Sequence, residues 1–233
     1  RRFGDYVTKQ YLIDKNEEAY AHVFVTHYPD EERPAARPLR TAPCYERMKE
    51  RGAVFGQKFG WERPNFFATD GMPQEDDWSF RRSRWFEAIR KEIANTTQNV
   101  GLLDMTAFAK CRVAGPGAEA FLDYFVANSL PKSVGGVSLA HALNTRGGVH
   151  SEFTIRRESG DSFYLVSAGA LQRLDHDYLK KHMPQDGSVQ FTQLTGAHGV
   201  LVLAGPRARQ LLERVTDADL SNEAFRWLTA QDI

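Results

Sequence analysis

The chain has 233 residues, of which 42% are hydrophobic and 26% charged, and 30 Lys and Arg side chains balance 30 Asp and Glu side chains. This ordinary composition predicts one large or two small globular domains, and the lack of a basic excess disfavours nucleic acid as a partner. The apolar runs are far shorter than the about 20 residues of a membrane-spanning helix, so we expect no membrane contact. Cys44 and Cys111 support neither a disulfide framework nor, with the histidines, a metal site.

Residues 1–41 predict a tail that is separate from the rest of the chain. Its aromatic residues show no sustained helical or strand period: Phe3, Tyr6, Tyr11, Tyr20, Phe24 and Tyr28. Two prolines and mixed charges over 30–40 predict an extended linker. Because a free linker would be polar, we expect these aromatic side chains to pack on a neighbouring surface.

Short elements are predicted after the tail. Pro43 suits a first helical turn and Gly52 a helix stop, which predicts a helix over 43–52. A strand that contains glycine residues is predicted over 53–60. Residues 65–79 contain a glycine, a proline and the acidic run Glu75, Asp76 and Asp77, which predicts a solvated loop.

The clearest helix is predicted over 83–98, where Ser83 can cap the first turn. Four apolar residues then follow at helical spacing: Trp85, Phe86, Ile89 and Ile93. Gly101 opens an apolar run that ends at Val113, and a strand is predicted in its second half.

Residues 113–122 and 203–212 are an internal repeat with an offset of 90 residues, the difference between Gly205 and Gly115. Each copy predicts a strand, a Gly-Pro turn and a helix with proline at its first position. With the hairpin between them, the two copies predict one sheet layer with helices on one face. Residues 115–120 also mimic a dinucleotide-binding fingerprint, but no later strand ends in the required acid, so the helix start is favoured.

A hairpin is predicted from strands over 137–144 and 149–157, joined by a Gly-Gly turn. A third strand is predicted over 162–168 and a helix over 170–183. Two further strands are predicted over the segments 189–195 and 199–203. The fold class is therefore predicted to be α+β, with mixed or antiparallel sheets and packed helices.

Glu152 is the unusual carboxylate because it lies inside a predicted strand. Period-2 alternation puts His150, Glu152 and Thr154 on one face of that strand. The acid is either an ordinary solvent-facing residue or a group rigidly aimed into a pocket, where it could orient a ligand or transfer a proton. The chain lacks a G-x-S-x-G elbow and shows no Cys–His nucleophile pattern, so hydrolase chemistry is unsupported.

Six motifs in a fixed order give the chain a family resemblance. They are Arg-Thr-Ala-Pro-Cys-Tyr at 40–45, Phe-Gly-Trp-Glu-Arg-Pro at 59–64, Gly-Leu-Leu-Asp-Met-Thr at 101–106, Asn-x-x-Gly-Gly-Val-x-x-Glu at 144–152, Tyr-Leu-Val-Ser at 164–167 and Leu-Ala-Gly-Pro at 203–206. In this order the chain resembles the folate-binding domain of the glycine-cleavage aminomethyltransferase (T-protein) family. The motif at 59–64 resembles the branch fused to flavin-dependent dimethylglycine and sarcosine dehydrogenases.

The resemblance implies that residues 1–41 are the tail of a flavin domain and that residues 42–233 are a folate-binding domain, incomplete at its C-terminus. The family's Tyr-x-Gly-Glu-x-Gly stretch would lie beyond Ile233. FAD would belong only to the missing flavin domain, which would be a partner within the same longer chain. We therefore expect the fragment alone to be inactive.

The resemblance also implies a tetrahydrofolate site that accepts a one-carbon unit from oxidative demethylation of an N-methylglycine-type amine, giving 5,10-methylenetetrahydrofolate. Glu152 stands where the T-protein has an Asp that contacts the reacting part of the pterin, and it would be catalytic. The ring would be held by Glu152 together with Phe108, Leu139, Val166 and Ala168. Two positions depart from the T-protein pattern, because Ala168 replaces Asn and Phe108 replaces Met.

Two other functions stay open on the sequence. One is a flavin-independent aminomethyltransferase, which should begin near Arg40 without a preceding aromatic segment. The other is a non-catalytic module that keeps the fold, since a fold does not fix a function. The cysteine usage and the resemblance favour a reducing compartment, the cytoplasm of a bacterium or the mitochondrial matrix of a eukaryote.

Overall fold

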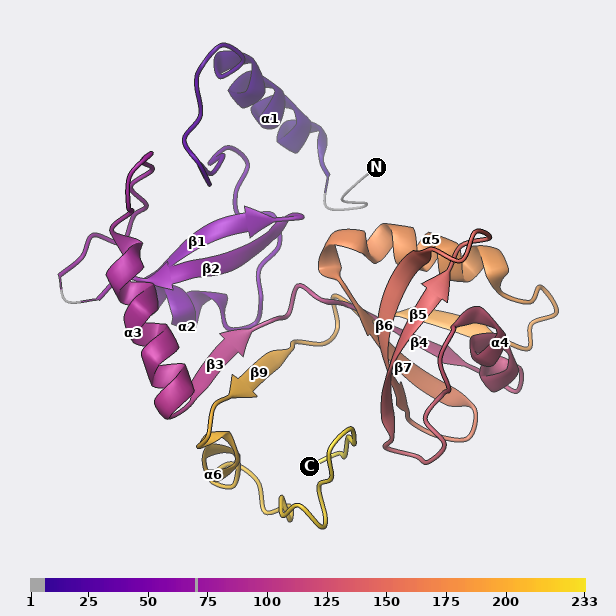
Figure 1. The fold of residues 1–233 in the computed structure, drawn as a ribbon. Coiled ribbons are helices and arrows are strands. Elements are labelled where there is room, and N and C mark those ends of the chain that lie inside the picture. Colours follow the sequence, from indigo (N-terminus) through magenta and orange to yellow (C-terminus); the bar gives the residue numbers. More distant parts are fainter. Residues whose placement is uncertain (1–6, 70) are drawn as a thin grey trace. The chain divides into compact units, whose positions relative to one another are not determined.

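The computed structural model describes residues 7–69 and 71–233, and its internal contacts divide the chain into two compact units (Figure 1). Unit 1 contains the described residues up to 104 together with 201–208. Unit 2 contains residues 105–200 and 209–233. The boundary predicted between residues 41 and 42 therefore falls inside unit 1.

The predicted tail contains a helix, α1 (Lys9–Ala21), so the expectation of an extended tail was wrong over these residues. The Thr8 hydroxyl oxygen caps this helix by accepting a hydrogen bond from the backbone N–H of Tyr11. None of the helical residues is buried. A helix without a buried side carries no apolar stripe, which is why the periodicity of the sequence does not reveal it.

The aromatic residues of the tail are mostly uncovered. Tyr28 packs on Phe80, with 4.9 Å between the ring centres. Tyr20 and Phe24 are 83% and 97% exposed, so the predicted packing of the tail aromatics is wrong for these two within unit 1. Two more residues of this set lie outside the described residues: Phe3 and Tyr6.

Unit 1 is built on the antiparallel strands β1 (Ala53–Lys58) and β2 (Trp61–Phe67). The helix predicted over 43–52 is confirmed as α2 (Tyr45–Glu50), and the strand predicted over 53–60 is β1. The predicted loop over 65–79 begins later than expected, because β2 continues to Phe67, and its residue 70 lies outside the described part. The small core of this unit joins the strands to the next helix through Val54, Phe66 and Ala88.

The helix predicted over 83–98 is confirmed as α3 (Trp85–Gln98). Ser83 makes no capping hydrogen bond from its side chain, and the Asp77 carboxylate accepts the backbone N–H of Arg84 instead. The predicted stripe is only half right, because Trp85 and Ile89 pack on the core whereas Ile93 is 59% exposed.

Unit 2 contains a five-stranded antiparallel sheet in the order β5-β6-β7-β4-β8 (Figure 1). Its strands are β4 (Ala109–Ala114), β5 (Val137–Leu143), β6 (Val149–Arg157), β7 (Ser162–Ser167) and β8 (Gln190–Gln193). Its helices are α4 (Ala118–Phe125), the short 3-10 helix η2 (Gly169–Leu171) and α5 (Gln172–His182). The predicted hairpin, third strand and following helix are confirmed.

The core of unit 2 lies on one side of this sheet. Phe121 and Phe125 of α4 and Leu179 of α5 pack there on Phe153 and Leu165 of the strands. All five side chains are at least nine-tenths buried. Both helices cover the same side, so they leave the other side of the sheet free of helices, and there Thr154 is exposed although Lys110 is buried.

The two repeat copies do not lie in one sheet layer, so that prediction was wrong. The first supplies β4 and α4 in unit 2, whereas the second supplies β9 (Leu201–Ala204), which pairs with β3 (Gly101–Asp104), and then α6 (Ala208–Leu212). The copies do share a backbone conformation, since Gly115 and Gly205 have φ values of 120° and 114°. Sequence similarity therefore reports the local strand–turn–helix conformation and not the sheet to which each strand belongs.

The helix-start interpretation of the Gly-Pro turn is confirmed in α4, with one difference. The helix begins at Ala118 with Gly117 at its N-cap, so Pro116 precedes the helix and does not occupy its first position. A β-carbon on Gly115 would meet the carbonyl oxygen of Ser188, and one on Gly117 would lie 2.6 Å from the Ser188 hydroxyl. Because the two glycines have no side chains, the loop that contains Ser188 can pack directly against this turn.

Candidate functional site

The strand that carries Glu152 has two different faces. Ser151, Phe153 and Ile155 are buried against the core, whereas Glu152 and Thr154 are exposed on the side opposite α4 and α5. This confirms the predicted alternation for these residues. The name open face is used below for the part of this side that β5, β6 and β7 form. On β4 the same side is covered, since Lys110, which pairs with Val166, is fully buried.

His150 does not share the open face with Glu152, so its predicted position was wrong. The register between β5 and β6 shifts between Ala142 and Leu143, which is a bulge of one extra residue on the β6 side. His150 lies at this bulge, and its ring stacks on Tyr178 of α5 with 3.7 Å between the ring centres. A bulge re-aims the side chain beside it, which simple alternation does not foresee.

The residues predicted to hold a ligand come together on the open face. Leu139, Thr154 and Val166 lie side by side on β5, β6 and β7. Strand pairing reaches Thr154 with Val166 and Ala109 with Ser167, and Ala168 and Phe108 lie directly next to these last pairs in the chain. Leu139, Glu152 and Val166 therefore occupy two adjacent rows of one face, and Ala168 and Phe108 lie just after β7 and just before β4.

The turn after β7 is held against the segment before β4. A β-carbon on Gly169 would collide with the carbonyl oxygen of Ala107 and would lie 3.6 Å from the backbone nitrogen of Phe108. This close approach of two backbones keeps Ala168 near Phe108 independently of strand pairing.

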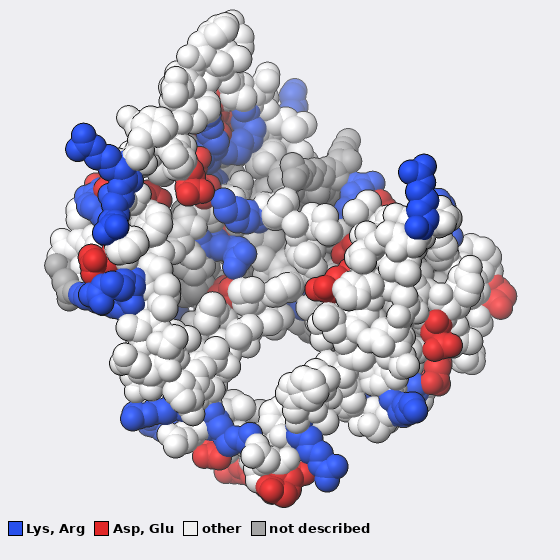
Figure 2. Space-filling model, viewed as in Figure 1, with Lys and Arg blue, Asp and Glu red and all other residues white. Residues whose placement is uncertain are grey.

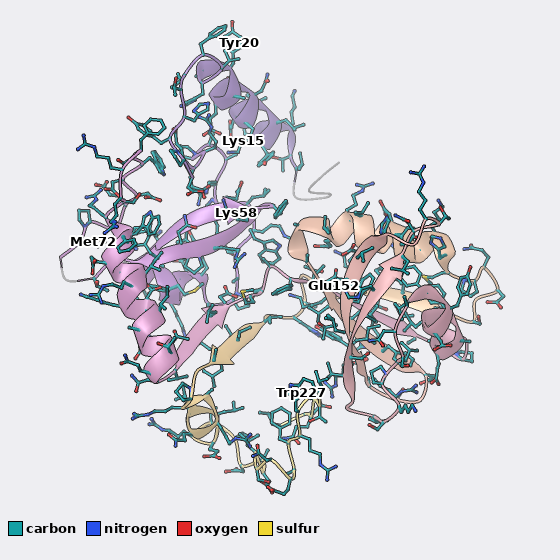
Figure 3. All side chains as sticks on the ribbon, viewed as in Figure 1. Lys15, Tyr20, Lys58, Met72, Glu152 and Trp227 are labelled. Carbon is teal, nitrogen blue, oxygen red and sulfur yellow. The ribbon has the colours of Figure 1, made fainter. Side chains whose placement is uncertain are left out.

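The site is exposed in unit 2 taken by itself. The Glu152 side chain is 61% exposed (Figure 3), and Leu139 is 48% exposed. Ala168 is exposed, and Phe108 and Val166 are half-buried. Unit 2 alone therefore offers an apolar surface beside a carboxylate, and it does not enclose that carboxylate.

A residue that the sequence did not indicate completes the site. The Nε2 atom of His141 lies 3.0 Å from Oε2 of Glu152, directly across the hairpin. In a hairpin without a bulge, the pairing of Leu143 with Val149 would place Ala140 opposite Glu152. The bulge shifts the pairing by one residue, so that His141 lies opposite Glu152 instead. The pair was therefore hidden by the same irregularity that turns His150 away.

A buried carboxyl supports the strand from the core side. Asp175 of α5 is 1% exposed, and burial raises the pKa of its carboxyl above the ordinary value. Hydrogen bonding to Ser167 and Ser151 opposes that rise. Ser151 is adjacent to Glu152 in β6, so this acid helps to define the backbone that presents the exposed one.

Replacing Asp175 with Asn is expected to stabilise the chain relative to wild type at pH 7 by about 1 kcal/mol, and to give little gain at pH 3. A raised pKa means that the folded state binds the proton more tightly than the unfolded state. The contribution of Asp175 to wild-type stability is then most favourable below the ordinary pKa of the carboxyl and is lost as the pH rises through the raised pKa. Urea denaturation of both proteins at the two pH values measures the difference, and an Asn variant with a pH-independent difference would contradict the assignment.

Other reactive groups of the described residues include the Cys111 thiol, which is buried. Burial raises the pKa of the Cys111 thiol to about 12, which makes it a poor nucleophile at neutral pH. Among the described residues, no group of three or more His, Cys, Asp and Glu side chains is placed to hold a metal ion. In the same part of the chain, no helix has the length and apolar composition to span a bilayer. Charges of both signs are interspersed over the face shown in Figure 2.

Comparison with known protein families divides the chain near the predicted tail boundary. Residues 44–233 match the family described as GCVT N-terminal domain. Residues 1–42 match the family described as FAD dependent oxidoreductase central domain. The first match covers most of the chain.

Two relatives align with almost the full length of this chain. The chain is 34% identical to mitochondrial dimethylglycine dehydrogenase of Mus musculus, over 97% of the chain and 26% of the relative. It is 26% identical to mitochondrial sarcosine dehydrogenase of Homo sapiens, over 98% of the chain and 29% of the relative. The chain thus spans little more than a quarter of the length of these relatives.

A solved structure supports the α+β fold. The aminomethyltransferase T of the glycine cleavage system from Bartonella henselae matches with a TM-score of 0.64 and 25% identity. The match covers 82% of this chain and 46% of that one.

Proposed function

Because the chain belongs to the GCVT N-terminal domain family, we propose that residues 42–233 bind tetrahydrofolate on the open face and accept a one-carbon unit there. The carbon would come from oxidation of an N-methylglycine-type amine, and the product would be 5,10-methylenetetrahydrofolate. The observation that carries this proposal is the grouping of Glu152, Leu139 and Val166 in two adjacent rows of one sheet face.

The residue types on this face suit a pterin. Leu139 and Val166 offer apolar contact to a flat ring, and Phe108 directly precedes β4 in the same unit. The Glu152 carboxylate sits at the margin of this apolar surface and can accept hydrogen bonds from the ring or from a reacting amine. A ligand site of this kind combines a mostly apolar lining with a few fixed polar groups.

The reaction requires that protons be moved. The amine of the folate attacks the carbon of an iminium ion, a C–N bond forms, and the attacking nitrogen must lose its proton. A second folate amine then displaces the demethylated amine, which leaves as a neutral molecule carrying one proton, and the other proton is released. Glu152 would accept the proton of the attacking nitrogen and stabilise the cationic intermediate, which is general-base and electrostatic catalysis.

FAD is assigned to another part of the longer protein, where it would supply the oxidation of the amine. The run from Gly115 to Ala120 does not fit a dinucleotide, because the β-carbon positions of Gly115 and Gly117 are directed at Ser188. The match of residues 1–42 to a flavin-dependent oxidoreductase family favours this arrangement over a stand-alone aminomethyltransferase.

Calorimetric titration tests the proposal. The longer flavoprotein that contains these residues is titrated with tetrahydrofolate, since unit 2 alone does not enclose Glu152. A saturable heat is expected, and a variant with Leu139→Asp and Val166→Asp should lose it, because two charges would be placed under the apolar ring. Absence of binding to the unmodified protein would favour the non-catalytic module.

A further inference from the structure

The two oxygen atoms of the Glu152 carboxylate have different surroundings. Oε2 lies 3.0 Å from Nε2 of His141. Within the described part of the chain, no hydrogen bond is found to Oε1. One oxygen is therefore engaged by the protein, and the other is available to a ligand.

The pairing is a consequence of the sheet. His141 and Glu152 are directly opposite each other on β5 and β6, which sets their Cβ atoms about 5 Å apart. Both side chains extend from the open face, and both come from regular strand positions next to the bulge. The backbone thus fixes both partners, so the contact does not depend on a flexible loop.

This contact has little value as a stabilising interaction. The side chains of His141 and Glu152 are 39% and 61% exposed, and exposed ion pairs contribute only about 0–1 kcal/mol. A contact that holds the fold together would be buried, as the hydrogen bond from Arg157 to the Pro131 carbonyl is in the same unit. The pair is better explained by what it does to the carboxylate.

Resting on the proposed function above, we propose that His141 is a positioning residue that holds Oε2 of Glu152 and directs Oε1 at the reacting amine of the folate. An ionised carboxylate can only accept hydrogen bonds, so Nε2 of His141 must carry the hydrogen. When Oε1 takes the proton of the attacking nitrogen, Oε2 keeps its hydrogen bond to the imidazole. The carboxyl group therefore stays in place through the step.

Two variants of His141 separate positioning from packing. Leu is similar in bulk and donates no hydrogen bond, whereas Gln carries an N–H donor at a comparable distance from the backbone. In the longer flavoprotein, His141→Leu should lower kcat for methylenetetrahydrofolate formation by about 10- to 100-fold, because misplacement of a reacting group costs that much. The KM for tetrahydrofolate should change little, and His141→Gln should restore most of the lost kcat.

His198 supplies the matched control. Its Nδ1 atom lies 3.0 Å from the Tyr164 hydroxyl, so His198→Leu also removes an exposed histidine hydrogen bond, but away from Glu152. This control should leave kcat unchanged. Equal losses in the Leu and Gln variants of His141, or no loss in either, would overturn the positioning role.

The variant Glu152→Gln distinguishes the two levels of the proposal. If the unmodified longer protein does not bind tetrahydrofolate, the proposed function itself fails. If it binds and Glu152→Gln forms product normally, the catalytic role of Glu152 fails and the role of His141 fails with it. If Glu152→Gln is impaired while His141→Leu is normal, only the role of His141 fails.

Discussion

Replacing Glu152 with Gln is expected to lower the rate of 5,10-methylenetetrahydrofolate formation by about 100-fold or more, the usual size of a general-base contribution. The amide keeps the shape and the hydrogen bonding of the side chain, but it cannot take a proton from the attacking amine. Oxidation of the N-methyl amine should stay near normal, because the proposed function assigns that step to another part of the longer protein. Product formation and amine oxidation are measured in parallel on that protein.

Two further variants make this test specific. Glu152→Asp keeps a carboxylate on a side chain that is one methylene shorter, and it should retain more activity than Glu152→Gln. Asp123→Asn makes the same acid-to-amide change at an exposed position of α4, on the other side of the sheet, and it should have no effect. A Gln variant that is as active as the Asp123→Asn control would remove Glu152 from the mechanism.

The hairpin that carries Glu152 was predictable because its signals agree with each other. A Gly-Gly turn, period-2 alternation and apolar residues on one side all predict the same two strands. The burial of Phe153 and Ile155 and the exposure of Glu152 follow from that alternation. The side-chain period of a strand is a geometric constant, so the sequence reveals it directly.

The bulge beside the turn could not be predicted. One extra residue opposite Ala142 and Leu143 turns His150 toward α5 and pairs Glu152 with His141. Pairing register depends on which backbone groups meet across the hairpin, and a single sequence does not record this. The predicted face of Glu152 was thus correct, and its partner was missed.

Unit 1 contains a helix that the hydrophobic pattern of the sequence did not reveal. The helix α1 buries none of its residues, and its stability comes from capping and polar contacts such as the bond from the Ala35 N–H to the Glu18 carboxylate. Hydrophobic periodicity detects burial rather than helicity, so it fails for a helix of this kind. The prediction made from the repeat was wrong for a related reason. The two similar strand–turn–helix sequences contribute strands to different sheets: β4 belongs to the five-stranded sheet, and β9 pairs with β3.

Replacing Gly169 with Ala is expected to destabilise unit 2 by about 2–3 kcal/mol, the cost of forcing extra volume into a packed position. The added methyl group would collide with the carbonyl oxygen of Ala107, a backbone atom that cannot rotate away. Relief requires the turn after β7 to move from the segment before β4. Hydrogen exchange of the β4 and β7 amides measures this loss locally.

Gly160→Ala is the control, because a β-carbon at Gly160 would meet nothing within 4 Å and its φ is not in the left-handed region. That variant should be neutral or slightly stabilising, since Ala restricts the unfolded chain more than Gly does. The two substitutions are chemically identical, so a large difference between them isolates the contact with Ala107. Movement of this turn would also separate Ala168 from Phe108. Gly169→Ala should therefore weaken tetrahydrofolate binding in the longer protein even where the chain remains folded, and unaltered affinity would show that the ligand does not use this end of the open face.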